Sequence, residues 1–311
     1  MQKLIPVVLF AYARPDHLRR TLACLHENNI PLLYVFADGP KIPEVVDRVN
    51  EVRQILHEID WCEVRLVERE ENLGLGKSIL TGVSEVFKIH EAILVFEDDL
   101  ICVPGTFAYM CAALEHYKDD LHVMSITGWT HPCITPSTIT DQPYFDGRAE
   151  SWSWGSWARA WKGMEQDAIT LMKQCKKQGI DIYKYGADLP EVARAEKKMN
   201  LWAVRFNYHL ILNGGLCLRP AHSMVNHIGF DNYGTNAKGP SNLSLKVLEP
   251  CPSIPQEWPV AIENPECPSL WRIQCGEKPS MLQTMLKPLV RYVRHSLPVR
   301  TVKYTIRRVK K

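Results

Sequence analysis

The chain has 311 residues, of which 46% are hydrophobic and 23% charged, and its formal net charge at pH 7 is +2. This length suffices for one large or two ordinary domains, and the composition is ordinary for a soluble globular protein. The ten cysteines form no CxxC pair, and no apolar run approaches the roughly 20 residues of a membrane span, so zinc-finger, thioredoxin-like and membrane-spanning classes are excluded.

The cysteines and the N-terminal residues favour a cytoplasmic protein. The cysteines are scattered, and reduced thiols are their simplest state, although Cys251, Cys267 and Cys275 lie close enough in sequence to leave one late disulfide open. The apolar run before Arg14 is brief and soon interrupted, unlike a signal peptide. We therefore expect the protein to stay on the side of the membrane where it is made.

Strand-like and helix-like patterns alternate along the first half of the chain. Continuous apolar runs predict strands at 5–12, 32–39, 62–70 and 92–99, and helical spacing predicts helices at 14–28, 41–59 and 72–89. Such alternation, with continuous apolar strands, is typical of a parallel sheet covered on both faces. These sheets bind ligands beyond the carboxyl ends of their strands.

The pattern changes after about residue 120. One more strand is predicted at 122–129, and a polar helical section ends near residue 200. The segment 201–220 predicts a helix, a Gly-Gly turn and a short strand. From residue 240 the chain is rich in proline and is expected to be irregular, and a basic segment closes it.

Three consecutive carboxylates, Glu97, Asp98 and Asp99, end the fourth predicted strand. They repel one another, so this strand end favours a nearby cation. Mg²⁺ and Mn²⁺ take oxygen ligands, often one or two carboxylates completed by substrate phosphates. A solvated acidic turn is the alternative, but the position beyond a parallel strand favours a metal site that serves a nucleotide diphosphate.

The segment ENLGLGKSIL at 71–80 partly matches a phosphate-binding P-loop. The motif needs a glycine five residues before Gly76, and that residue is Glu71. Because a carboxylate there would oppose a triphosphate, we reject the P-loop. What remains is a flexible loop that leads into a helix N-terminus, and such a terminus can lie beside a ligand.

Six segments, taken in order, resemble the GT-A fold nucleotide-sugar glycosyltransferases. They are PVVLFAYARPDHLRRTL, YVFADGP, ENLGLGKSILTGV, ILVFEDDL, MSITGW and SWSWGSWARAW. The pattern is most similar to bacterial glycosyltransferases of surface-polysaccharide gene clusters, and more distantly to the eukaryotic N-acetylglucosaminyltransferase that starts complex N-glycans. The likeness covers about residues 4–240. It implies an α/β fold of the GT-A (Rossmann-like) type, with a mostly parallel central sheet flanked by helices.

The resemblance also implies a domain organisation. Residues 1–240 would form the glycosyltransferase domain, with a nucleotide-sugar half at about 1–125 and an acceptor half at about 126–240. Residues 241–285 would be a Pro-rich irregular region, and 286–311 a basic amphipathic tail.

Roles for particular residues follow from the same resemblance. Arg14 matches an arginine that meets the nucleotide diphosphate, and its planar guanidinium suits that group. Asp38 matches an aspartate that hydrogen-bonds the base, a uracil in the eukaryotic relatives, although Asp38-Gly39-Pro40 is also a good turn sequence. In the acidic signature the last aspartate, Asp99, binds the metal. Glu97 and Asp98 approach the ribose and the sugar.

The tryptophan-rich segment 151–161 has two interpretations. Helical spacing places Trp154, Trp157 and Trp161 on one face of a helix, which favours core packing. In the resembling family this segment flanks the sugar and the acceptor, and aromatic rings suit the C–H faces of sugars. We expect Trp161 in the core, and we leave core and sugar binding open for Trp154.

The chain departs from the family pattern at two positions. Inverting transfer needs a general base, and the family's acidic residue before the W-A-x-R segment is replaced by Asn200. Glu196 is the nearest upstream carboxylate and a candidate base, and Asp231, Asp188 and Glu191 are the other candidates. The histidine of the family's late GFDxxGTH motif is replaced by Asn236.

The tail at 286–311 carries basic and apolar residues and no acidic one. Such a cationic amphipathic end attracts anionic lipid headgroups, and a solvated tail is the alternative. No nucleic-acid motif or aromatic platform accompanies the charge, so we expect no nucleic-acid partner. We therefore expect a cytoplasmic protein that can lie at the inner face of the membrane.

The sequence thus predicts a glycosyltransferase, a hexosyl- or N-acetylhexosaminyltransferase that uses Mn²⁺ or Mg²⁺. It would move a sugar from a nucleotide-sugar donor, UDP-linked, to a hydroxyl of a saccharide or a lipid-linked saccharide. The expected stereochemistry is inverting, and the expected setting is surface-polysaccharide biosynthesis. The alternatives are a non-catalytic nucleotide- or glycan-binding relative and a sugar nucleotidyltransferase. The latter would need a Gly-rich phosphate loop, which 11–20 lacks.

Overall fold

The computed structural model of the protein describes residues 4–230 and 248–277. Its strands are β1 (Val7–Ala11), β2 (Leu32–Ala37), β3 (Glu63–Glu68), β4 (Ala92–Glu97), β5 (Leu100–Cys102), β6 (Val123–Thr127), β7 (Tyr144–Asp146), β8 (Trp154–Trp157), β9 (Leu216–Arg219) and β10 (Val225–His227). In the described ranges, eight of them form one sheet in the order β3-β2-β1-β4-β8-β6-β9-β7. The other two, β5 and β10, pair antiparallel with each other.

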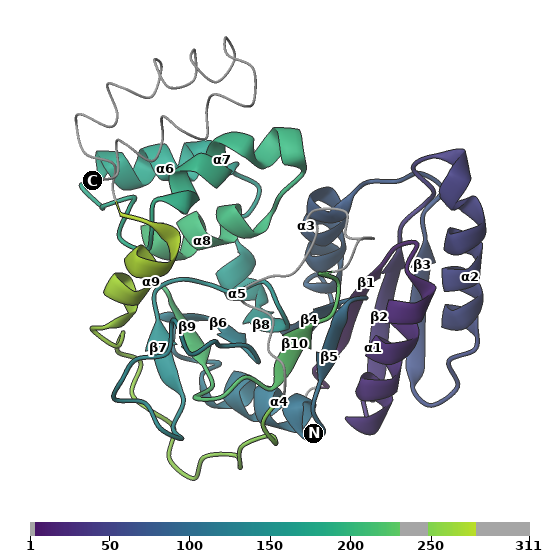
Figure 1. Ribbon diagram of the computed structural model, residues 1–311, viewed down its shortest axis with the longest axis horizontal. Coiled ribbons are helices and arrows are strands. Elements are labelled where there is room, and N and C mark those ends of the chain that lie inside the picture. Colours follow the sequence, from purple (N-terminus) through teal and green to yellow (C-terminus); the bar gives the residue numbers. More distant parts are fainter. Residues whose placement is uncertain (1–3, 231–247, 278–311) are drawn as a thin grey trace, which may run out of the picture.

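Most neighbouring strands of the large sheet run parallel. Strands β3, β2, β1 and β4 share one direction, and β6 pairs in parallel with β9. Strand β8 is antiparallel to both of its neighbours, and β7 is antiparallel to β9. The predicted α/β class with a mostly parallel sheet is confirmed (Figure 1).

Helices cover both faces of this sheet. They are α1 (Pro15–Glu27), α2 (Val46–His57), α3 (Leu75–Val86), α4 (Thr106–His116), α5 (Ala158–Trp161), α6 (Ala168–Lys177), α7 (Asp188–Met199), α8 (Ala203–Leu212) and α9 (Cys267–Cys275). Because side chains alternate along a strand, Val7 and Leu9 pack in the layer with α1, α2 and α4, whereas Val8 and Phe10 pack in the layer with α3, α5 and α8. Both faces are therefore buried, as continuous apolar strands require.

The helical interpretation of the tryptophan-rich segment is wrong. Trp154 and Trp157 lie on β8, and only Ala158–Trp161 forms a short helical turn. Three residues apart on a strand, the two rings point to opposite faces, so Trp154 packs on the α3 side and Trp157 on the α4 side. Gly155 allows this insertion, because a Cβ there would lie 2.6 Å from Leu94 Cδ2. The helical spacing of these aromatic residues was coincidental.

The region predicted to be irregular contains α9. Trp271 of α9 is buried, and its Nε1 donates to Asp146 Oδ2 (2.7 Å), which also accepts from Arg219 Nε (2.7 Å). The helix is short, so its apolar periodicity is too brief to be recognised in a Pro-rich context. The ten cysteines are all free thiols, so the late disulfide that was left open does not form.

None of the helices in the described ranges combines the length and the apolar character that a bilayer crossing needs. The basic tail at 286–311 lies outside the described residues.

Candidate active site

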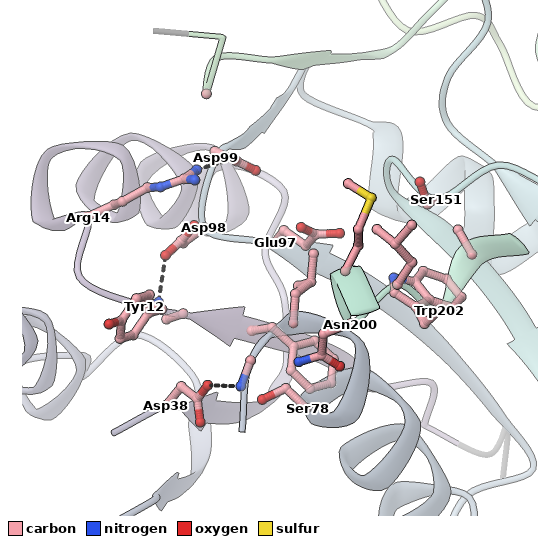
Figure 2. A pocket seen from close by; sticks show the side chains of 18 of the residues that line it. Tyr12, Arg14, Asp38, Ser78, Glu97, Asp98, Asp99, Ser151, Asn200 and Trp202 are labelled. Atoms are coloured by element: carbon pink, nitrogen blue, oxygen red, sulfur yellow. Dashed lines mark hydrogen bonds and ion pairs between the residues drawn. The ribbon is translucent and has the colours of Figure 1, made fainter. Parts of the chain in front are cut away.

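A cavity of about 400 Å³ opens at the carboxyl ends of β1, β2 and β4. This is the edge of a parallel sheet where ligands bind, and the size lies in the ordinary range for small-molecule sites. One side is polar and comes from the first half of the chain. The opposite side comes from the α7–α8 corner and includes Asn200 and Trp202. Figure 2 shows Arg14, Asp98, Asp99 and Glu97 gathered on the polar side.

Asp98 lines the cavity, and two hydrogen bonds fix its position. Its Oδ2 accepts from the backbone N–H of Tyr12 (2.7 Å), and its backbone carbonyl accepts from Thr21 Oγ1 (2.9 Å). Burial and the neighbouring Asp99 raise the pKa of Asp98 to about 7, although Arg14 opposes the shift. Burial, Asp99 and Asp98 likewise raise the pKa of Glu97 well above its usual range. A cation bound in the cavity would favour the charged forms of Glu97 and Asp98.

Asp99 presents one oxygen that no described residue satisfies. Its Oδ2 forms an ion pair with Arg14 Nη1, whereas Oδ1 is buried and has no hydrogen-bond partner in the described part of the chain. Burial lowers the pKa of Arg14, but Asp98 and Asp99 outweigh it and raise that pKa overall. A buried, bare carboxylate oxygen beside further carboxylates fits a hard divalent cation such as Mn²⁺ or Mg²⁺.

The described residues contain no cluster of three or more His, Cys, Asp or Glu side chains arranged to hold a metal ion. A site of this kind would therefore depend on substrate oxygens to complete its coordination shell.

Asp38 lies in the cavity wall, where both of its carboxylate oxygens are already engaged. Oδ1 accepts from Leu73 N and Oδ2 from Gly74 N, each at 2.9 Å, and Arg69 Nη1 lies 3.9 Å from Oδ1. Asp38 therefore fixes the loop that enters α3. The carboxylate of Asp38 thus has a structural role. Because Asp38 and this loop both line the cavity, its contact with the base of a nucleotide stays a prediction.

Asn200 caps the N-terminus of α3. Its backbone carbonyl accepts from Gly76 N (3.0 Å), its Oδ1 accepts from Lys77 N (3.0 Å), and its Nδ2 donates to Leu73 O (2.9 Å). Gly74 and Gly76 permit this approach, since a Cβ on either would collide with Asn200. The helix terminus that the sequence offered to a ligand is thus occupied by the chain's own amide and carbonyl groups.

Glu196 is not placed to act as a base. It is 2% exposed and absent from the cavity lining, its Oε1 accepts from Arg205 Nε (2.7 Å), and its Oε2 accepts from Ala168 N (2.8 Å). The Glu196 carboxylate instead connects α7 to α6 and α8. Asp231 and Asn236 lie outside the described residues.

Trp154 is a core residue and not a sugar-binding one. It is fully buried against Trp161, Trp202 and Phe206 and does not line the cavity. Trp152, two residues earlier, lines the cavity instead. Trp152 lies before β8, and Ser153 between the two tryptophans has a left-handed backbone (φ 50°), so the two rings do not share a face as residues two apart on a strand would.

The sequence did not reveal the contribution of β10 to the site. His227, Gly229 and Phe230 line the cavity because β10 pairs with β5, directly after Asp99. His227 Nε2 lies 3.4 Å from Asp99 Oδ2. No local pattern predicts this pairing between segments more than a hundred residues apart, and a histidine in isolation is more often structural.

Comparisons with known proteins bear on the first part of the chain. Residues 7–132 match the family model described as glycosyl transferase family 2. No curated protein matches the sequence.

Two solved structures show a low overall likeness. A mannosyltransferase from Pyrobaculum calidifontis, in complex with GDP-Man and Mn²⁺, has a TM-score of 0.36 and 12% identity, covering 57% of this chain and 46% of its own. The chain thus spans about half the length of that protein. A UDP-glucose pyrophosphorylase complexed with UDP-glucose has a TM-score of 0.34 and 11% identity, covering 70% of this chain and 90% of its own.

The family match runs from β1 to the loop after β6 and includes the acidic motif, Arg14 and Asp38. In this part, the chain is similar to glycosyl transferase family 2.

Proposed function

We propose that this protein is a metal-dependent glycosyltransferase that moves a sugar from a nucleotide-sugar, UDP-linked, to a saccharide hydroxyl. One observation carries the proposal: Asp99 keeps a bare, buried Oδ1 beside Arg14 at the carboxyl edge of a parallel sheet. A carboxylate that offers one oxygen and an arginine that offers planar donors suit a metal-bound diphosphate. The family match over the same residues supports it.

The proposed mechanism is direct displacement at the anomeric carbon, with inversion. Asp99 would hold Mn²⁺ or Mg²⁺ through Oδ1, and Arg14 would donate to the diphosphate. A bound divalent ion would neutralise the charge that develops on the leaving diphosphate. Glu97, which lines the cavity beside Asp98, would accept from hydroxyls of the donor. The acceptor hydroxyl loses its proton to a base, and we assign that role to Asp231, which follows the cavity-lining Phe230 in sequence.

The acceptor and the location are also part of the proposal. The cavity wall formed by the α7–α8 corner and Trp152 faces the carboxylates, and we assign it to a saccharide or lipid-linked saccharide acceptor. The basic residues of 286–311 would hold the enzyme at the inner face of a membrane. The setting would be surface-polysaccharide biosynthesis.

A donor screen tests the proposal. The protein is incubated with Mn²⁺ and each of UDP-, GDP-, dTDP- and CMP-sugars, and release of the free nucleotide is followed. Asp99→Ala removes the proposed metal ligand, and Asp119→Ala, at an exposed position in the turn that follows α4, is the matched control. We expect release from one donor class that requires metal, persists in the control and is lost in Asp99→Ala.

Release that persists unchanged in Asp99→Ala, or that needs no metal, would contradict the proposed mechanism. Release from a donor other than UDP-sugars would retain the transferase and correct the nucleotide.

A second candidate function has its own observation. Asn200 and Glu196, the two positions nearest to the family's acidic residue, are both committed to holding helices together. A non-catalytic relative that binds nucleotide and metal would need no base there. Calorimetry separates the two, because such a relative binds a nucleoside diphosphate with Mn²⁺ but releases nothing from any donor.

A further inference from the structure

The segment from His227 to Gly229 contacts Asp99 through both backbone and side chain. Strand β10 pairs with β5 so that His227 lies opposite Leu100, and Ile228 N then donates to the carbonyl of Asp99 (2.9 Å). His17 Nε2 lies 3.3 Å from the carbonyl oxygen of Ile228, which belongs to the next peptide group. A turn more than a hundred residues downstream is thereby fixed against the candidate metal ligand.

Gly229 is required for this close approach. A Cβ at position 229 would collide with Asp99 Oδ2 and would lie 2.9 Å from Arg14 Nη1. With no side chain there, the backbone N–H of Gly229 reaches His227 Nδ1 at 3.1 Å.

That contact decides which ring nitrogen of His227 carries the proton. Because Nδ1 accepts from Gly229 N–H, the neutral ring bears its proton on Nε2. Nε2 lies 3.4 Å from Asp99 Oδ2, so the imidazole faces the carboxylate as a donor. A metal ion needs a lone pair on the nitrogen that it binds, and Nε2 does not offer one in this arrangement.

The ring itself is held in place by its neighbours. It contacts Trp152 and Phe230 with centroid distances of 4.8 and 4.4 Å, and its side chain is only 12% exposed. A half-turn of the ring about its Cβ–Cγ bond would break the hydrogen bond from Gly229 N–H to Nδ1.

The two oxygens of Asp99 are therefore unequal. Arg14 Nη1 and His227 Nε2 both converge on Oδ2, whereas Oδ1 is buried with no partner among the described residues. A carboxylate fixed through one oxygen presents the other in a defined direction. Replacing a group that orients a metal ligand in this way commonly weakens metal binding.

We propose that His227 is a positioning residue that holds Oδ2 of Asp99, so that Asp99 binds a divalent cation through Oδ1 alone. The inference rests on the proposed function, since it assumes that Asp99 is a metal ligand. It assigns the histidine to the ligand's orientation and not to the coordination shell.

Direct metal binding tests the inference without any need for turnover. Calorimetry measures Mn²⁺ affinity in the presence of UDP for the wild-type protein, His227→Ala and His227→Gln. His222→Ala is the matched control, because His222 lies shortly before β10 and its side chain is 52% exposed. Urea unfolding of each protein shows whether the fold is kept.

We expect His227→Ala to weaken Mn²⁺ binding by about 10- to 100-fold. His227→Gln retains an N–H donor of similar reach and should restore the affinity to within about threefold of the wild type. The control should bind like the wild type.

The outcomes separate the two proposals. If the wild type binds no Mn²⁺ with UDP, the metal site of the proposed function fails. If the wild type binds and folded His227→Ala binds equally well, the positioning role is overturned. If His227→Gln is folded and as weak as His227→Ala, the ring itself is needed, which overturns the donor role and favours direct ligation.

Discussion

The side-chain oxygen of Asn200 accepts a hydrogen bond from the backbone N–H of Lys77 at 3.0 Å, across 123 residues of sequence. The same residue has a left-handed backbone (φ 50°, ψ 51°) and ends α7. One asparagine thus ends one helix and caps another, and it ties the α7–α8 corner to the nucleotide side of the cavity.

Replacing Asn200 separates the two contributions. Asn200→Ala loses the side-chain cap and places a Cβ residue in the left-handed region, so we expect a loss of about 2–3 kcal/mol in the free energy of unfolding. Asn200→Gly loses the cap but tolerates the backbone, so we expect about 1–2 kcal/mol. Urea denaturation measures both. Equal losses in the two variants would show that the backbone conformation contributes nothing.

Glu196 is predicted to matter for stability and not for proton transfer. Glu196→Ala leaves Arg205, whose side chain is 15% exposed, without its carboxylate partner, and we expect a loss of about 3–5 kcal/mol. Where enough folded Glu196→Gln is obtained, its pH–rate profile should keep the wild-type shape. A basic limb that disappears in Glu196→Gln would restore Glu196 as the base.

Trp152 and Trp154 should respond in opposite ways to the same change. Trp154→Ala removes a fully buried ring and should cost about 3–5 kcal/mol of stability. Trp152→Ala removes a ring from the cavity wall and should lower kcat/KM about tenfold, or about 1.4 kcal/mol, with a smaller loss of stability. Urea unfolding and steady-state kinetics are measured on both variants. The reverse pattern would contradict the assignment of Trp152 to the cavity wall and of Trp154 to the core.

The raised pKa of Asp98 gives the metal-free protein a definite pH dependence. Its pKa is about 7 in the folded protein, and about 4 is expected in the unfolded chain. Between these values the folded state holds more protons, so the free energy of unfolding decreases as pH rises. The contribution is fully present below about pH 4 and is lost as pH rises through about 7.

Asp98→Asn tests this dependence, because it removes the titration and keeps an acceptor for Tyr12 N–H. Relative to the wild type, we expect the variant to gain about 2–4 kcal/mol in the free energy of unfolding between pH 4 and pH 8. Unfolding curves are recorded with a chelator present. Parallel pH profiles for the two proteins would show that Asp98 is not the group responsible.

Elements with a strong local signal were predicted well. The strands β1 to β4 are continuous apolar runs, and α1, α2 and α3 have clear helical spacing, so their order and the parallel sheet followed from the sequence. Strand β8 was missed because four residues that include Trp154 and Trp157 fit either period. The pairing of β8 between β4 and β6 depends on tertiary contacts that no local window contains.

The residues of the candidate site also fall into those that local patterns predict and those that depend on tertiary contacts. Arg14, Asp38 and Asp99 stand at ends of adjacent parallel strands, so their convergence follows from the topology that the sequence predicts. The roles of Glu196 and Asn200 depend on what packs against them, namely Arg205 and the N-terminus of α3. His227 reaches Asp99 only because β10 returns to β5, which is a long-range event.

The insertion of β8 has a consequence for the order in which the molecule can be assembled. Strand β4 leads into the acidic motif, and within 4–230 and 248–277 the edge of β4 that faces away from β1 pairs with residues 154–157, from Ala92–Trp157 to Val95–Trp154. A chain emerging from the ribosome therefore holds an exposed apolar strand edge for some sixty residues of synthesis, and such edges invite association with other chains. A fragment cut at residue 132, where the family match ends, would keep that edge open permanently. The part of the chain that carries the recognisable sequence is thus not a part that can be expected to stand alone.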